Sequence, residues 1–202
     1  MSKRTKSILF SLIVFVVLVI GGKFYMDRMK VDNLYRRGFQ LYEEQIATYL
    51  KENYSGISKI EFSPIFKSGG NGEGFVYARI VPVVYDTYGN KVYLRNDGVL
   101  KMGVADYEMT AGIDLDFNIN DGSEIIYLRN DQKESISVES YQNLPDELKL
   151  NKDEITNEVM EAFSREGHLK GVEKNDQGSP QAEIVYNLEI RRVQGREFYE
   201  WK

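Results

Sequence analysis

The feature that most constrains this chain is an unbroken apolar run close to its start. Ser7–Gly22 reads SILFSLIVFVVLVIGG and contains no charged residue. A helix that crosses the hydrocarbon of a bilayer needs about 20 residues. The run reaches that length if it extends to Met26, with the ammonium of Lys23 reaching out to the interface. The sequence therefore predicts a transmembrane signal anchor over residues 7–26, with Phe24 and Tyr25 at the membrane surface.

Two other interpretations of the run are open. A secretory signal peptide that is cleaved also begins with a basic segment. Gly21 and Gly22 supply one of the two small residues that cleavage needs, but valine or isoleucine occupies the other position. A buried core helix is the third interpretation, and such helices normally carry a polar face, which this run lacks. An uncleaved anchor is the interpretation that we favour.

Basic residues flank the run on both sides, so its orientation has to be argued. Residues 1–6 hold three cations, which favour a cytoplasmic N-terminus, but five more cations lie just beyond the run: Lys23, Arg28, Lys30, Arg36 and Arg37. The short tail is strongly basic and costly to translocate, whereas long domains cross largely regardless of charge. We expect a single-pass protein of the cell membrane, with a basic cytoplasmic tail at 1–6, its N-terminus inside and its body extracytoplasmic.

The body is acidic, although the whole chain has a net charge of only −5. Residues 31–202 hold 20 Lys and Arg and 30 Asp and Glu, a balance of −10. Such a body repels phosphates, which argues against nucleic acid as a partner. A basic protein is the natural electrostatic complement, but solubility at the cell surface alone suffices to explain the charge and is the favoured explanation. The absence of cysteine excludes disulfides, thiolate chemistry and Cys-ligated zinc.

The segment after the anchor has the spacing of an amphipathic helix, which we place at residues 27–56. Apolar residues step by three and four along it: Tyr35, Phe39, Tyr42, Ile46, Tyr49 and Leu50. Gly56 follows where a left-handed cap is expected. The helix either continues from the anchor or bends at Gly21, Gly22 or Gly38. We favour packing of the stripe on the body's own sheet over a partner surface.

Residues 57–202 read as a β-rich body with a mainly antiparallel sheet, so the predicted fold class is α+β. One further helix is expected at about 152–166, because Asn151 and Glu154 resemble a capping box and Gly167 provides a stop. Residues Ala182 to Val193 read as one long strand.

One stretch of the body, Ile113–Asn120, alternates strictly between apolar and polar residues. Asp114 and Asp116 then share a face with two asparagines, while the four apolar side chains point the other way. The start resembles an EF-hand loop, but isoleucine stands where that loop needs its glycine and its final glutamate. A half-buried strand with a solvated face is the favoured interpretation, and no metal site is predicted. Asp114 and Asp116 are candidate protein-binding residues.

Trp201, the single tryptophan, is a third candidate for protein binding, if it does not pack on a sheet edge. Catalytic motifs are absent from the sequence: His168 is the only histidine, and neither H-E-x-x-H nor G-x-S-x-G occurs. We therefore predict no enzymatic activity and no cofactor.

The plan of the chain is a basic tail, one membrane helix, an amphipathic helix and a small β-rich body. In this layout it resembles uncharacterised membrane-anchored proteins of Gram-positive bacteria, and more loosely TipC-type immunity proteins. The anchor is the only distinct motif of the resemblance, so no site residues are transferred. The resemblance implies neutralisation of a secreted toxin at the outer membrane face. We expect a membrane-anchored extracytoplasmic binding protein of open oligomeric state. The alternative is an accessory or structural subunit of a membrane assembly.

Overall fold

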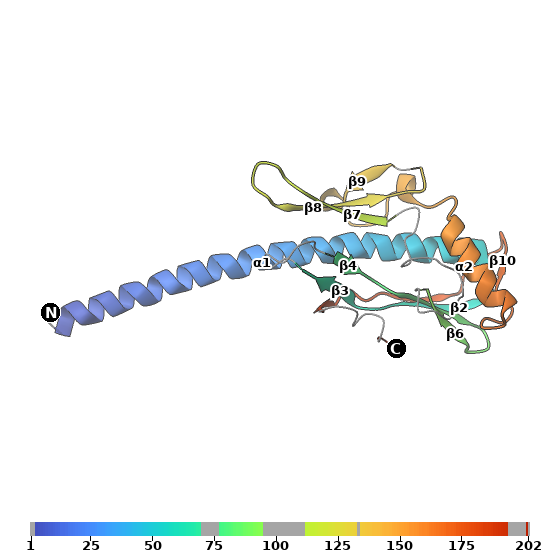
Figure 1. The fold of residues 1–202 in the computed structure, drawn as a ribbon, viewed down its shortest axis with the longest axis horizontal. Helices are drawn as coiled ribbons and strands as arrows, with labels where there is room; N and C mark the ends of the chain where they lie inside the picture. The colour runs from blue at the N-terminus through green and yellow to red at the C-terminus, as the bar shows by residue number, and fades with distance from the viewer. Residues whose placement is uncertain (1–2, 70–76, 95–111, 133, 194–200, 202) are drawn as a thin grey trace.

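A single long helix runs through the whole molecule. The computed structural model describes residues 3–69, 77–94, 112–132, 134–193 and 201, and α1 spans Lys3–Asn53 (Figure 1). The predicted anchor and the predicted second helix are therefore one continuous element, and Gly21, Gly22 and Gly38 all lie inside it. The helix ends at Asn53 and not at residue 56.

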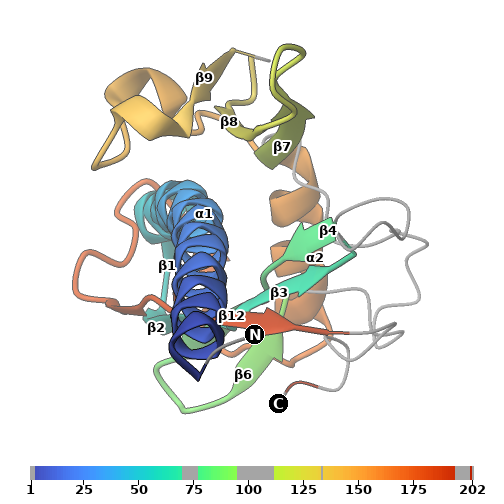
Figure 2. The ribbon, with the colours of Figure 1, turned by 90° about the vertical axis from the view of Figure 1, so that its left-hand side faces the viewer.

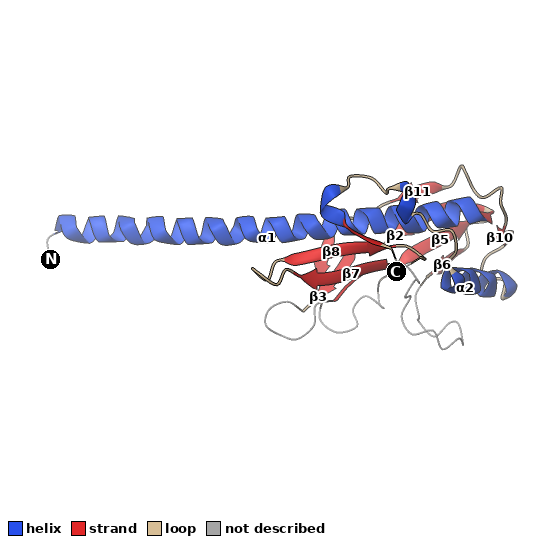
Figure 3. Cartoon of the chain, turned by 90° about the horizontal axis from the view of Figure 1, so that it is seen from above, coloured by secondary structure: helices blue, strands red, loops and turns tan. Residues whose placement is uncertain are grey.

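The two halves of α1 have opposite surroundings. Apolar side chains from Phe10 to Met29 are exposed. Figure 3 shows that the N-terminal part of the helix projects beyond the body. The C-terminal half is buried at Tyr35, Phe39, Leu41, Ile46, Ala47, Tyr49 and Leu50. Among the described residues, α1 is the one helix long and apolar enough to cross a bilayer.

The rest of the chain wraps around this C-terminal half. Seen along α1, the strands β7, β8 and β9 lie on one side of the helix, and β3, β6 and β12 lie on the other (Figure 2). Two apolar clusters follow each other along the helix: Tyr35 and Phe39 pack with residues of β3 and β8, and Ile46 and Leu50 pack with residues of β2, β5 and α2. The stripe is thus covered by the body itself, but the helix is not simply amphipathic here, because Leu41, Glu43, Gln45 and Ala47, which lie off the stripe, are buried as well.

Short strands form the sheets. Their bounds are β1 Tyr54–Ser55, β2 Ile57–Phe62, β3 Ile65–Ser68, β4 Tyr77–Arg79, β5 Pro82–Asp86, β6 Lys91–Tyr93, β7 Gly112–Phe117, β8 Glu124–Arg129, β9 Ser135–Ser137, β10 Glu173–Lys174, β11 Glu183–Val185 and β12 Ile190–Arg192. The orders are β11-β2-β5-β6, β12-β3-β4, β7-β8-β9 and the pair β1-β10. Six of these eight pairings are antiparallel, which confirms a mixed α+β fold with mainly antiparallel strands.

The prediction of one long strand from Ala182 to Val193 is wrong. The chain forms β11 and β12, which belong to different sheets and pair in parallel with β2 and β3. The interruption matches a break between β2 and β3 at Ser63-Pro64, where proline has no N–H for a ladder hydrogen bond. Between β11 and β12, the ring of Tyr186 stacks on Phe62 with ring centroids 6.1 Å apart.

The second α-helix, α2, spans Glu154–Arg165 and begins later than predicted. Its N-cap is Asp153, whose side chain accepts a hydrogen bond from the backbone N–H of Thr156 at 3.2 Å. The prediction of a capping box formed by Asn151 and Glu154 is therefore wrong. With Asp153 as the N-cap, Glu154 is the first residue of the helix and not the third, which a capping box requires. The predicted stop is confirmed by Gly167, which adopts φ +77° after the helix. Two 3₁₀ turns, η1 Val138–Ser140 and η2 Asp146–Leu148, precede α2.

Gly56 has the positive φ that a cap position requires, +80°, but the strand β1 separates it from the end of α1. A Cβ at this position would lie 1.9 Å from the carbonyl oxygen of Gly171. Gly56 therefore serves the close approach of the segment between α2 and β10 as well as the turn out of β1.

Candidate functional site

The sheet β7-β8-β9 has one face on α1 and one face away from it. Ile113, Leu115, Ile126, Leu128 and Ile136 belong to the apolar cluster around α1. Because side chains alternate along a strand, the other face carries Asp114, Asp116, Ile125, Tyr127, Arg129, Ser135 and Ser137, as the strand register requires. We call this second set the outer face.

The two candidate aspartates lie side by side on the outer face, and both are exposed. Asp114 is opposite Tyr127, and its Oδ2 lies 3.4 Å from Nη1 of Arg129. Asp116 is opposite Ile125, and its Oδ1 accepts a hydrogen bond from the backbone N–H of Phe117. Solvent screens a partly exposed ion pair such as Asp114–Arg129. The outer face therefore offers an acidic strand beside one arginine and one tyrosine, with part of its charge balanced locally.

The strict alternation of this strand does not continue to its end. Phe117 and Ile119 were expected on the buried side, but they are 52% and 97% exposed. Phe117 belongs to the last strand pair, opposite Glu124, and Ile119 lies in the turn beyond it. The turn is closed by hydrogen bonds from the N–H of Asn118 to the carbonyl of Ser123 and from Gly122 back to Asn118. The expectation fails because Phe117 and Ile119 lie outside the apolar cluster around α1 in which Ile113 and Leu115 are partly buried.

Trp201 packs on the edge of a different sheet. Its ring meets the ring of Tyr93 in β6 edge to face, with centroids 5.9 Å apart, and it is partly buried. Asp114 and Asp116 belong to β7, on the other side of α1 from β6 (Figure 2). The structure therefore does not bring the three candidate residues together, and the outer face and Trp201 are separate surfaces.

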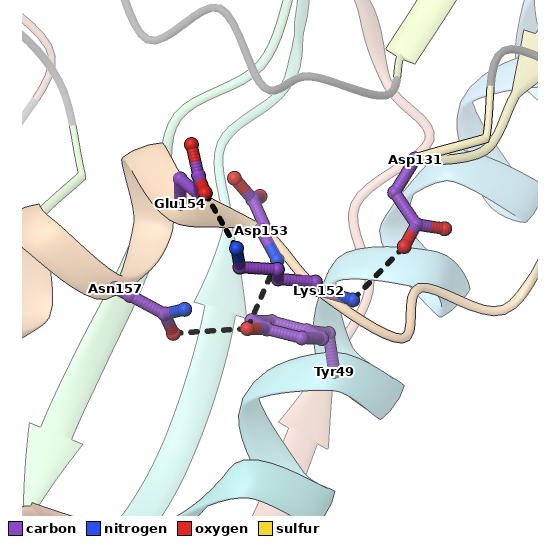
Figure 4. Close-up of polar contacts among 6 residues, drawn as sticks. All are labelled: Tyr49, Asp131, Lys152, Asp153, Glu154 and Asn157. Carbon is purple, nitrogen blue, oxygen red and sulfur yellow. Dashed lines mark hydrogen bonds and ion pairs between the residues drawn. The ribbon is translucent and has the colours of Figure 1, made fainter.

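A buried polar junction that sequence reasoning missed joins α1 to α2 (Figure 4). The hydroxyl of Tyr49 donates to Oδ1 of Asn157 at 2.9 Å and accepts from the backbone N–H of Asp153 at 3.1 Å. The hydroxyl of Tyr54 donates to the same Oδ1 at 2.6 Å. The N–H of Lys152 also donates to the carboxylate of Asp131. Tyr49 and Tyr54 lie about a hundred residues from Asn157, so no local sequence pattern indicates these contacts. The hydrogen bonds hold the end of α1 against the start of α2, which is a structural role.

Glu43 is a buried carboxyl group on α1 that the sequence also did not single out. Its Oε2 accepts a hydrogen bond from the backbone N–H of Asn187 at 3.1 Å, between β11 and β12. Burial raises the pKa of Glu43 to about 8, with a smaller contribution from the neighbouring Glu44. The group is therefore mostly protonated at neutral pH.

Two further titratable side chains, those of His168 and Asp86, lie at or just beyond the ends of a helix and a strand. His168 packs edge to face on Phe163 after the end of α2, and its Nε2 lies 3.5 Å from Glu166. Asp86 accepts hydrogen bonds from the N–H groups of Tyr88, Asn90 and Lys170, and from the amide of Asn90. Burial opposes ionisation of Asp86, but these bonds together hold its pKa below the usual value. Within the described ranges, no cluster of three or more His, Asp or Glu is placed to hold a metal ion.

These features define a class: an α+β body built on a helix whose first half is long, apolar and exposed. A comparison with protein-family models finds no model that matches the chain, and searches of curated proteins and of solved structures find no match either.

Proposed function

We propose that this chain is a membrane-anchored extracytoplasmic binding protein. The observation that carries the proposal is α1, whose exposed apolar half continues without a break into the helix at the centre of the body. Burying one large apolar side chain is worth about 1.5–3 kcal/mol, so water is a poor environment for the many exposed between Phe10 and Met29. A bilayer supplies the missing apolar surroundings, and the continuous helix holds the body at the surface.

The surface that we propose for the partner is the outer face of β7-β8-β9. It combines the exposed carboxylates of Asp114 and Asp116 with the aromatic side chain of Tyr127, on a body of net charge −10. A basic protein is the partner that such a surface would attract most quickly. Neutralisation of a secreted toxin, the function that the resemblance to TipC-type immunity proteins implies, is one concrete form of this proposal.

Cell fractionation and protease accessibility test the anchor and its orientation. The full-length chain should stay in the membrane pellet after a high-salt wash, because salt does not screen apolar insertion. An external protease should digest the body once the cell wall is removed. A shed protein that begins near Gly22 would contradict the uncleaved anchor, and a protected body would reverse the topology.

The partner surface is tested by photo-crosslinking and by kinetics. A crosslinker at position 116 in intact cells should capture a basic protein, whereas one at Glu173 in β10 should not. Association of that protein should slow as salt rises, since the Debye length falls from about 10 Å at 0.1 M to about 3 Å at 1 M. Asp114→Asn with Asp116→Asn should slow association with little change in dissociation.

The matched control for the kinetic test is Glu173→Gln with Glu183→Gln, which removes the same charge from the exposed strands β10 and β11. If the two double variants associate equally slowly, the outer face is not the site and only net charge matters. If neither variant nor salt changes the rate, the electrostatic argument fails, and the surface around Trp201 becomes the better candidate.

One observation favours the alternative function, an accessory or structural subunit of a membrane assembly. The apolar half of α1 is exposed on all sides, and beyond the neighbouring part of α1 itself, no described atom lies within 4 Å of where a Cβ on Gly21 or Gly22 would be. Small residues of this kind allow close contact with other membrane helices. Replacing residues 7–26 by an unrelated membrane helix separates the two functions: retained function supports the binding protein, and lost function supports the subunit.

A further inference from the structure

The most exposed large apolar side chain in the described parts of the body lies at the tip of the β7–β8 hairpin. It is Ile119, and Phe117 precedes it with half of its surface exposed. Both residues continue the alternating pattern whose earlier members, Ile113 and Leu115, are partly buried against α1, so they are exposed although their sequence pattern is that of the buried side. Single exposed apolar residues are common on proteins, so exposure alone indicates no function. The inference depends on where this pair lies relative to α1.

The hairpin lies beside α1, and its tip points toward the N-terminal end of the helix in two perpendicular views (Figures 1 and 3). Two contacts fix its level along the helix. The side chain of Ile126 lies against Gly38, since a Cβ built there would be 2.8 Å from Cγ2 of Ile126. Further toward the tip, Glu124 pairs with Lys67, whose ammonium stands over the ring of Tyr35. The tip of the hairpin therefore lies closer to the proposed membrane segment than the rest of the hairpin does.

The level of the tip follows from strand and helix geometry. Ile119 and its neighbours lie two to three residues beyond the pair of Phe117 and Glu124. At about 3.3 Å per strand residue this is about 7–10 Å, the length of about 5–7 residues of α-helix at 1.5 Å each. Counted from Tyr35, the tip is level with Arg28–Lys30 on α1, just outside Met26. The headgroup layer extends about 5–7 Å beyond the hydrocarbon on each side, so the tip reaches that layer.

We propose that the tip of the β7–β8 hairpin is a second membrane-contact site, which inserts Ile119 and Phe117 into the headgroup layer of the leaflet from which α1 emerges. The inference rests on the proposed anchoring by α1. The chemistry of the tip suits an interface: two apolar side chains alternate with Asn118 and Asn120, whose amide groups are able to hydrogen-bond to lipid headgroups and water.

Charge at this level does not oppose the contact. Asp116 and Asp121 lie near the tip, and α1 carries Asp27, Arg28 and Lys30 at about the same height. Carboxylates and cations are thus mixed close to the surface without an excess of positive charge, which favours zwitterionic over anionic phospholipid as the lipid that the tip meets. Together with α1, the tip gives the body two points of attachment, which would restrict rotation about the helix axis and give the outer face a defined direction.

The chain has no cysteine, so single cysteines can carry an environment-sensitive fluorophore in the full-length protein. Three positions are labelled: Ile119→Cys at the hairpin tip, Phe24→Cys on the exposed part of α1, and Tyr88→Cys as the matched control. Tyr88 is also an exposed turn residue, in the β5–β6 turn at the end of the body away from the N-terminus (Figure 1). The labelled proteins are reconstituted into phosphatidylcholine vesicles that contain lipid spin-labelled at the headgroup.

We expect the probe at position 119 to shift its emission to the blue and to be quenched by the headgroup spin label, and the probe at position 88 to behave as in water. Quenching at 24 without quenching at 119 would overturn the hairpin contact and leave the anchor in place. If the probe at 24 is not quenched, the anchor fails and the hairpin contact fails with it. Equal quenching at 88 and 119 would also overturn the proposal, because the body would then lie on the membrane without a preferred contact.

Discussion

Lys67 and Glu124 form an ion pair that joins the two sides of the body across α1. The ammonium of Lys67 lies 3.3 Å from Oε2 of Glu124 and 3.5 Å from the ring centroid of Tyr35. Lys67 belongs to β3 and Glu124 to β8, and their side chains are only 4% and 19% exposed. Burial lowers the pKa of Lys67, whereas the carboxylate of Glu124 stabilises the charged form of this lysine. The ion pair therefore stabilises a cation at a buried site where desolvation alone would disfavour the charge.

We expect Lys67→Met to lower the free energy of unfolding by about 2–3 kcal/mol, because it leaves a mostly buried carboxylate without its cation. Urea unfolding of the full-length protein in detergent measures this. Adding Glu124→Gln should recover part of the loss, as in a double-mutant cycle.

Lys59 provides the matched control for Lys67. It also pairs with a glutamate, Glu61, at 3.0 Å and also stands over a tyrosine ring, but both partners are about 30% exposed. Lys59→Met should cost less than about 1 kcal/mol. Equal losses for the two lysine variants would show that burial of the Lys67 pair has no special weight.

The buried Glu43 predicts a pH-dependent stability. The folded chain keeps a proton on this carboxyl up to a pKa of about 8, whereas the unfolded chain loses it near 4.5. The folded state therefore binds more protons between these values, so its stability falls as pH rises from 4.5 to 8, by about 5 kcal/mol in total for this group.

Glu43→Gln should flatten that part of the profile, since glutamine resembles the protonated acid and still accepts from the N–H of Asn187. The measurement is urea unfolding of both proteins from pH 4 to 9. As a control, Glu154→Gln removes an exposed carboxyl whose pKa is lowered by Lys152, so it should not flatten the profile. Parallel curves for the parent and Glu43→Gln would contradict the buried acid.

Asn157 accepts hydrogen bonds from two buried hydroxyls, those of Tyr49 and Tyr54. Asn157→Ala should destabilise the protein by about 3 kcal/mol, because both hydroxyls lose their acceptor inside the body. Tyr54→Phe removes only one donor and should cost about 1 kcal/mol. Combining the two changes should cost less than their sum, since they share one hydrogen bond. Strict additivity in urea unfolding would mean that the hydroxyls find other partners.

Gly38 allows the sheet β7-β8-β9 to approach α1 closely. A Cβ at this position would lie 2.8 Å from Cγ2 of Ile126 and 3.6 Å from Cγ2 of Val138. Gly38→Leu should therefore cost about 2–3 kcal/mol through overpacking, despite the better helix propensity of leucine. Gly22→Leu is the control, because that position has no neighbour within 4 Å. Similar unfolding curves for Gly38→Leu and the parent would contradict this close packing.

The features that could be predicted from the sequence have local causes. The stripe from Tyr35 to Leu50 repeats with the period of a helix, and the structure buries it against the body. Gly167 ends α2 because a left-handed residue stops a helix wherever it occurs. Asp114 and Asp116 share an exposed strand face because side chains alternate along any strand.

The features that were missed depend on distant partners. The sequence predicted Asn151 as the capping residue of α2, whereas the structure has Asp153, whose backbone N–H donates to the hydroxyl of the distant Tyr49. The split of the last strand into β11 and β12 depends on the break between β2 and β3. Lys67, an ordinary surface residue by type, is buried because β3 lies against Tyr35.

The sequence by itself determined the long apolar helix, the α+β class and the acidic character of the body. A helix makes its backbone hydrogen bonds within one segment, so composition and period suffice to define it. Only the tertiary structure decided that Glu43 is buried, that Trp201 lies apart from the outer face, and that Ile119 is left exposed beside α1. Burial is a property of what covers a residue, and here the covering segments lie up to 144 positions away along the chain.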